Sequence, residues 1–184
     1  MEEVWDLYNE KREKTGCLLQ RGKPIPKGCY HLVVSAWIMN SQGQYLLSQR
    51  HPDKQYPLYW ECTGGSVLAG ESSFEGAIRE VKEELGIALD PTCAKLIHQT
   101  RRDSVQDFYD VWLFRADVDI CEIRLQQSEV INVKWVNRSV LLDMFRKDKL
   151  HPLIDFIPIG SQFYNQGDER RWIKVFIQNG YFTM

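Results

Sequence analysis

The stretch Gly65–Ile87 reads GSVLAGESSFEGAIREVKEELGI, and its spacing is the most informative feature of the chain. Glu80, Glu83 and Glu84 stand at positions i, i+3 and i+4, so their carboxylates project from one face of a helix. Like charges at this spacing repel each other. A divalent cation such as Mg²⁺ or Mn²⁺ turns that repulsion into attraction, because these hard ions prefer carboxylate oxygens. The stretch therefore predicts a metal-binding face, and the alternative is a solvated acidic surface.

The sequence also indicates where this helix begins and ends and which of its sides is buried. Ser72 and Glu75 fit a capping box at its start, and Gly86 fits a left-handed cap at its end. Apolar residues recur at helical spacing on the opposite side, namely Phe74, Ala77, Ile78, Val81 and Leu85. The small residues Thr63-Gly64-Gly65 predict a preceding loop whose backbone can approach a phosphate or a metal.

The fixed positions of this stretch resemble the Nudix box, G-x5-E-x7-R-E-U-x-E-E-x-G-U, where U is aliphatic. Every fixed position matches: Gly65, Glu71, Arg79, Glu80, Val81, Glu83, Glu84, Gly86 and Ile87. The preceding PLYWECTGG at 57–65 also looks like the usual approach to this box. The resemblance covers about the central half of the chain. It implies a hydrolase that cleaves a diphosphate linked to another moiety, usually a nucleoside diphosphate derivative.

The remaining elements predict an α/β fold. Residues 4–8 and 17–19 suggest an N-terminal β-hairpin, and further strands are expected at 30–39, 45–49, 94–99, 108–118 and 130–136. Asn137 or Ser139 can cap a helix that runs to about Lys147. Strands flanked by helices on two sides imply a three-layer α/β/α sandwich. This agrees with the mixed sheet between helices that the Nudix resemblance implies.

We expect a single domain over residues 1–184, because this length suits one hydrophobic core. Residues 1–28 would form the hairpin and lead-in, 29–148 the core with the box at 65–87, and 149–184 a C-terminal helical segment. A closing helix is expected at 170–178.

The charges of the residues in this box indicate which of them bind a metal and which of them orient the ligands. Glu80, Glu83 and Glu84 are the predicted ligands of Mg²⁺, with Mn²⁺ as the alternative ion, and a backbone carbonyl near Gly65 can complete the coordination. Arg79 stays protonated, so we expect its guanidinium to orient carboxylates through a fork to Glu71 or Glu83. Glu83, Arg79 and Glu80 are the predicted catalytic residues, and Gly65 and Glu71 support them. The general base is Glu83 or an acid outside the box.

Two acids outside the box, Asp110 and Glu129, are candidates for an additional metal carboxylate, and the alternative for each is a surface acid. Arg50 and His51 follow a strand and either reach a phosphate or form a solvated turn.

A second resemblance is to isopentenyl-diphosphate isomerase, a non-hydrolytic relative on the Nudix fold. It rests on the N-terminal hairpin followed by YHLVVS at 30–35, which includes His31. The isomerase needs a cysteine near Gly65, where this chain has glycine, and Cys62 is displaced by three residues. Together with the intact box, this favours a hydrolase with isomerase-like architecture over an isomerase.

Composition limits the partners and the compartment. The net charge of −2 and the isoelectric point near 6.1 give no basic footprint for a nucleic-acid polymer. The N-terminus lacks a signal-peptide pattern, and no apolar run approaches the roughly 20 residues that cross a bilayer. Five cysteines without a C-x-x-C pair predict reduced thiols in a cytoplasmic protein. A homodimer is compatible with these features.

The sequence leaves the substrate open among nucleoside triphosphates, nucleotide sugars, dinucleotides and prenyl diphosphates. It also leaves open a domain that binds a nucleotide or diphosphate as a sensor without turning it over.

Overall fold

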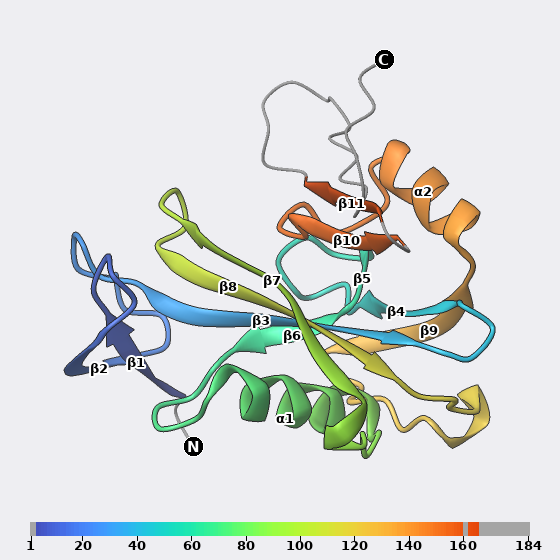
Figure 1. The fold of residues 1–184 in the computed structure, drawn as a ribbon, viewed down its shortest axis with the longest axis horizontal. Helices are drawn as coiled ribbons and strands as arrows, with labels where there is room; N and C mark the ends of the chain where they lie inside the picture. Colours follow the sequence, from blue (N-terminus) through green and yellow to red (C-terminus); the bar gives the residue numbers. More distant parts are fainter. Residues whose placement is uncertain (1–2, 160–161, 166–184) are drawn as a thin grey trace.

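The computed structural model describes residues 3–159 and 162–165 and has a mixed β-sheet at its centre (Figure 1). The strand order is β5-β4-β3-β8-β7, with β6 also paired to β3 and β9 also paired to β4. These strands are β3 (His31–Met39), β4 (Tyr45–Arg50), β5 (Trp60–Glu61), β6 (Thr63–Ser66), β7 (Ala94–Arg102), β8 (Asp107–Arg115) and β9 (Val130–Val136). Strands β3 and β8 run parallel, and the other pairs are antiparallel.

Helices cover both faces of this sheet. Helix α1 (Ser73–Leu85) lies against one face, and α2 (Arg138–Arg146) lies on the other side beside the strand pair β10 (Phe156–Ile159) and β11 (Gln162–Asn165) (Figure 1). Two short 3₁₀ helices, η1 (Pro91–Cys93) and η2 (Ile120–Glu122), lie in the connections. The predicted three-layer α/β/α arrangement with a mixed sheet is confirmed. Among the described residues, no helix is both long and apolar enough to cross a bilayer.

Helix α1 has the predicted boundaries. The Ser72 Oγ accepts from the Glu75 backbone N–H at 3.3 Å, and the Glu75 carboxylate accepts from the Ser72 N–H at 2.8 Å. Gly86 ends the helix with φ +68°, a left-handed conformation that a side chain disfavours. Val81 and Leu85 are almost fully buried against the sheet, which contributes about 1.5–3 kcal/mol each. Because Val81 and Leu85 face the sheet, Glu80 on the acidic side of the helix lies against Gly65 of β6.

The core is divided by the sheet. The cluster on the α1 side includes Leu32, Val34, Ala36, Ile38, Leu46, Val67, Ala77, Val81, Leu85 and Phe114. The cluster on the α2 side includes Trp37, Tyr45, Leu47, Cys62, Tyr109, Val111, Leu141, Met144, Ile154 and Phe156. Alternate residues of β3 therefore enter different cores, as the period-two geometry of a strand requires.

The predicted N-terminal hairpin is present as β1 (Val4–Tyr8) and β2 (Lys14–Gln20). Tyr8 and Tyr30 exchange backbone hydrogen bonds of 2.8 and 2.9 Å, which ties the hairpin to the start of β3. The Ala69 N–H donates to the Val4 carbonyl at 2.8 Å, so the hairpin also touches the loop before α1. The hairpin is thus docked on the domain through backbone pairing.

Two expectations differ from the structure. Thr63-Gly64-Gly65 is not a loop but part of β6, which pairs with Val34, Ser35 and Ala36 of β3. A Cβ on Gly64 would overlap the Val34 carbonyl oxygen, so the glycine that lowers strand propensity is what permits this close pairing. The described part of the C-terminal segment contains β10 and β11 where a helical segment was expected. Pro158 in the apolar run at 156–159 disfavours a helix, and the closing helix expected at 170–178 lies outside the described residues.

Candidate functional site

The site is organised around Arg79, whose guanidinium joins the acids of α1 to the loop before it. Its Nε and Nη2 donate to the two carboxylate oxygens of Glu71 at 2.8 and 3.1 Å. Its Nη1 donates to Glu80 at 2.9 Å and to Glu83 at 3.0 Å, and Nη2 also donates to the Ser66 carbonyl at 3.0 Å. Burial disfavours the charge of Arg79, but the bonds to Glu71 and the charge of Glu80 outweigh it and raise the pKa of the guanidinium. Arg79 therefore remains a cation that fixes three carboxylates.

Glu80 lies directly over Gly65. A Cβ added to Gly65 would approach the Glu80 carboxyl carbon to 2.6 Å, closer than van der Waals contact allows. The absence of a side chain at residue 65 is thus what lets the Glu80 carboxylate reach the backbone of β6. Burial raises the pKa of Glu80, and the adjacent Arg79 charge opposes that rise. The arrangement places a carboxylate and a strand backbone within reach of one small ligand.

Glu84 is the most deeply buried acid of the three, with 5% of its surface exposed. Its Oε2 is buried and has no hydrogen-bond partner among the residues that the structure describes. Lys54 lies beside it, and its Nζ forms an ion pair with Glu84 Oε1 at 3.8 Å, which is too long for a hydrogen bond. Burial raises the pKa of Glu84 to about 8, and the charge of Lys54 opposes this effect. A buried carboxylate with an unpartnered oxygen is costly unless a ligand completes it.

Glu83 differs from Glu80 and Glu84 because its side chain is 53% exposed. The hydrogen bond from Arg79 holds it at the edge of the site, where water has access. The three glutamates therefore extend from a buried position to a solvated one along a single helical face.

Two further acids reach this face from outside α1. Glu129 forms an ion pair with Lys54, and its carbonyl accepts from the His51 N–H at 2.9 Å. Glu61 on β5 is held by Arg50, whose Nη1 contacts its two carboxylate oxygens at 2.8 and 2.9 Å. Both acids are close enough to Glu84 to raise its pKa. The structure thus brings the predicted Glu129 to the site and adds Glu61, which was not among the predicted site residues.

The carboxylates of this site form ion pairs with basic side chains of the same protein. Arg79 holds Glu71, Glu80 and Glu83, and Lys54 lies between Glu84 and Glu129. Over the described ranges, no three acid, histidine or cysteine side chains converge closely enough to hold a metal ion. The oxygen donors nevertheless fit Mg²⁺ or Mn²⁺ in kind, and the orphaned Glu84 oxygen is the donor that such an ion would satisfy.

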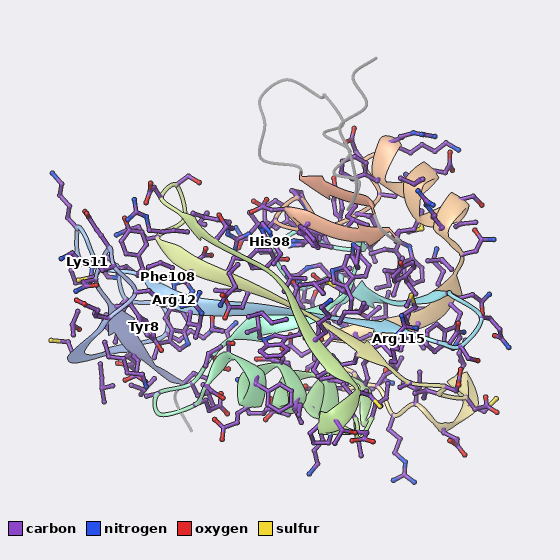
Figure 2. The ribbon with its side chains drawn as sticks, in the orientation of Figure 1. Tyr8, Lys11, Arg12, His98, Phe108 and Arg115 are labelled. Atoms are coloured by element: carbon purple, nitrogen blue, oxygen red, sulfur yellow. The ribbon has the colours of Figure 1, made fainter. Side chains whose placement is uncertain are left out.

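Asp110, the other predicted accessory acid, has a different environment. It is fully buried on β8, and Arg12 of the hairpin loop contacts both of its oxygens, with 2.7 Å from Nη1 to Oδ1. Gln99 donates to the same Oδ1 at 3.1 Å. Figure 2 shows Arg12 beside Phe108, and its guanidinium lies 5.4 Å from the centre of that ring. Asp110 therefore anchors the hairpin to the sheet, and the structure does not bring it to the glutamates of α1.

A pocket of about 360 Å³ lies next to the acidic face and includes Gly64, Gly65 and Glu61 in its wall. Its lining also includes Tyr56 and His151, whose rings meet edge to face at 4.9 Å. Burial and the nearby charges of Arg50, Lys54 and Arg102 lower the pKa of His151 to about 4, so its ring is neutral at pH 7. The acids and this pocket share Glu61 and the backbone of β6.

The pocket also contains Cys62, His31 and Tyr109. Cys62 is buried, and burial raises the pKa of its thiol to about 12, so it is not an activated nucleophile. The hydroxyls of Ser35 and Tyr109 lie 2.6 Å apart beside it. His31 stacks on Trp5 with ring centroids 4.4 Å apart, and its Nδ1 lies 3.2 Å from the Gln106 carbonyl. His31 is thus packed and hydrogen-bonded, as expected of a structural histidine.

Comparison with known proteins agrees with the geometry of this site. A family model described as the NUDIX domain matches residues 29–156, which is more than half of the chain. This chain belongs to the Nudix family. The uncharacterized Nudix hydrolase lmo0368 of Listeria monocytogenes is 41% identical over 143 residues, which cover 76% of this chain and 82% of that protein. The chain is thus a Nudix hydrolase, and the family implies hydrolysis of a nucleoside diphosphate-linked substrate.

Two more comparisons place this Nudix protein among its relatives. The crystal structure of DR0079 from Deinococcus radiodurans has a TM-score of 0.67 and 26% identity, over 80% of this chain and 91% of that one. An isopentenyl-diphosphate Delta-isomerase from Escherichia coli is 32% identical over 154 residues, covering 74% of this chain and 78% of that protein. The predicted likeness to the isomerase branch is confirmed.

Proposed function

We propose that this Nudix hydrolase cleaves the diphosphate linkage of a nucleoside diphosphate derivative and uses Mg²⁺ held by Glu80, Glu83 and Glu84. The proposal is supported above all by the buried Oε2 of Glu84, which has no hydrogen-bond partner within residues 3–159 and 162–165 and lies in a group of carboxylates beside a pocket. A buried, unsatisfied carboxylate oxygen weakens the fold unless it serves a ligand. A bound divalent ion would neutralise phosphate oxygens and lower the pKa of a coordinated water.

The residues around the ligands have complementary tasks. Arg79 keeps Glu80 and Glu83 in one orientation by donating to both while Glu71 holds the far side of the guanidinium. Gly65 leaves room for the Glu80 carboxylate. Glu83 is the most exposed of the three glutamates, so we assign it the proton taken from the attacking water. Glu129 is the accessory acid in this proposal because it approaches Glu84 from outside the helix.

The lining of the pocket favours a substrate that combines a charged phosphate with a second, ring-bearing group. Arg21, Arg50 and Arg102 line the pocket together with Glu61 and Asp107, so its lining has more basic than acidic side chains, which suits the negative charge of a diphosphate. Tyr56 and the neutral His151 add ring surfaces to the same lining. The charge and ring pattern supports a nucleoside diphosphate derivative over a purely inorganic substrate.

The test is a library of nucleoside diphosphate derivatives and prenyl diphosphates, incubated with the full chain and Mg²⁺. Released nucleoside monophosphates or prenyl phosphates are converted to phosphate by an added phosphatase and measured. We expect release from at least one nucleoside diphosphate derivative, and its loss when a chelator removes the metal. Tight binding of such a compound without release would show a sensor domain and contradict the proposed hydrolysis.

A further inference from the structure

Lys54 occupies an unusual position for a lysine, because its side chain is only 19% exposed and points into a cluster of acids. Its Nζ lies 3.8 Å from Glu84 Oε1 and closer still to Glu129 Oε2. It also lies near enough to Glu61 to oppose the rise in that residue's pKa. Lysine is a compact cation on a long stem, so it can neutralise carboxylates whose geometry suits another ion.

The fit of Lys54 to Glu84 is incomplete. The separation of 3.8 Å exceeds hydrogen-bond length, and in the described part of the chain the second oxygen of Glu84 has no hydrogen-bond partner. Asp110 in the same protein has a complete ion pair for comparison, since Arg12 contacts both of its carboxylate oxygens. Lys54 thus balances the charge of Glu84 without satisfying its hydrogen-bonding capacity. A divalent ion bound to Glu84 would repel the ammonium at this distance.

Lys54 belongs to the loop 51–59 between β4 and β5, and this loop also forms part of the pocket wall. Gln55 and Tyr56, the next two residues, line the pocket. Tyr56 and Leu58 have φ angles of +55° and +64°, a left-handed conformation that costs a non-glycine residue on the order of 1 kcal/mol or more. Such a conformation persists only when surrounding contacts impose it. The ion pairs of Lys54 are among the contacts that hold this loop.

We propose that Lys54 is a resident counter-ion of the metal site, that a divalent ion displaces it from Glu84 and Glu129, and that its release shifts loop 51–59. Lys54 is then a positioning residue that links occupancy of the acids to the wall of the pocket. This inference rests on the metal assignment proposed above. It adds that the protein carries its own competitor for the metal, on the loop that contributes Tyr56 to the pocket.

The experiment measures Mn²⁺ binding to the full chain after chelator treatment, by following free Mn²⁺ with electron paramagnetic resonance. Lys54→Met is compared with wild type and with Lys147→Met, which removes the same charge from an exposed pair with Asp143 on α2. We expect Lys54→Met to bind Mn²⁺ roughly tenfold more tightly, because the ammonium of Lys54 no longer competes for Glu84. Lys147→Met should match wild type. Lys54→Arg retains a competing cation and should not show the gain.

The outcomes separate this inference from the proposed function. If wild type binds Mn²⁺ but Lys54→Met binds it equally or more weakly, the counter-ion role is wrong and the metal site stands. If neither protein binds Mn²⁺, the metal assignment and this inference both fall. Should Lys54→Met yield too little folded protein, Lys54→Gln serves the same comparison.

Hydrogen exchange tests the link to the loop. In wild type, Mg²⁺ should increase amide exchange in peptides that cover 51–59, because the displaced Lys54 no longer holds them. In Lys54→Met the same peptides should exchange rapidly before Mg²⁺ is added, with little further change. Unchanged exchange of 51–59 in wild type under saturating Mg²⁺ would overturn the proposed coupling.

Discussion

Glu84 and Asp110 are two buried carboxylates in one small domain, and their surroundings are opposite. Asp110 is enclosed by Arg12 on both oxygens and by Gln99, so its charge and its hydrogen-bonding capacity are satisfied. Within the described ranges, Glu84 has an ion pair with Lys54 that is too long for a hydrogen bond and an oxygen without a hydrogen-bond partner. This difference shows that burial alone does not tell whether an acid stabilises the fold or binds a ligand. The completeness of its partners separates an acid that holds the fold from one that awaits a ligand.

The largest expected effect comes from Glu84→Gln, which keeps the shape of the side chain and removes its charge. Turnover of the best library substrate with Mg²⁺ should fall roughly a thousandfold, equivalent to about 4 kcal/mol of transition-state stabilisation. Without metal, thermal stability should stay level or rise slightly, because glutamine removes the cost of burying an ionisable group whose pKa burial raises. Glu122→Gln, which makes the same change at an exposed acid, should leave turnover unchanged. Near-wild-type turnover of Glu84→Gln would remove Glu84 from the metal site.

Asp110→Asn should show the reverse pattern. It leaves Arg12 without its buried counter-charge, so we expect a loss of about 2–3 kcal/mol in the free energy of unfolding. Denaturant titration measures this loss, with Asp143→Asn at an exposed ion pair as the control that should cost less than about 1 kcal/mol. Turnover of the folded protein should remain close to wild type. If Asp110→Asn instead lost turnover at unchanged stability, Asp110 would belong to the active site.

Arg79→Lys examines how the acids of α1 are oriented. Lysine keeps the positive charge but cannot bind Glu71 with a planar fork while also reaching Glu80 and Glu83. We expect a roughly 10- to 100-fold loss of turnover, because partners of this kind orient metal ligands. Melting temperature should change little. The control is Arg115→Lys at an exposed position on β8, and equal activity of the two variants would refute the orienting role.

The smallest effect is expected from Cys62→Ser. The thiol is buried with a pKa raised to about 12, so it should contribute little to hydrolysis. With labelled isopentenyl diphosphate and Mg²⁺, wild type should form no allylic isomer at a useful rate, since that reaction needs a placed proton donor. An allylic product that forms with wild type and disappears in Cys62→Ser would reassign the chain to the isomerase reaction.

The sequence predicted the elements whose signals are local. The helix at 73–85 follows from its capping box, its C-terminal glycine and its apolar period, and all three are present. The strands at 31–39 and 130–136 follow from β-branched and aromatic residues. Strand β6 was missed because Gly64 and Gly65 lower strand propensity, while close pairing with β3 and contact with Glu80 require them.

The site could be predicted only in part, because its outer members meet through tertiary structure. The glutamates of α1 share one helical face, so their proximity is visible in their spacing. Lys54 and Glu61 come from a loop and a two-residue strand, and neither has a motif that indicates its neighbours. Asp110 was predicted as a candidate metal carboxylate because it is an acid on a strand. Its partner Arg12 is distant in sequence, and the two meet only because the hairpin packs on the sheet. A signal was available for Glu61, which lies between the tryptophan and the glycine pair before the box.

The central claim is that the acids of α1 hold a divalent ion, and anomalous diffraction from crystals soaked with Mn²⁺ tests it most directly. The account predicts an anomalous peak in wild type within coordination distance of Glu84 and Glu80, with Lys54 withdrawn, and no such peak in Glu84→Gln. A strong peak elsewhere, or full Mn²⁺ occupancy of the same position in Glu84→Gln, would contradict it.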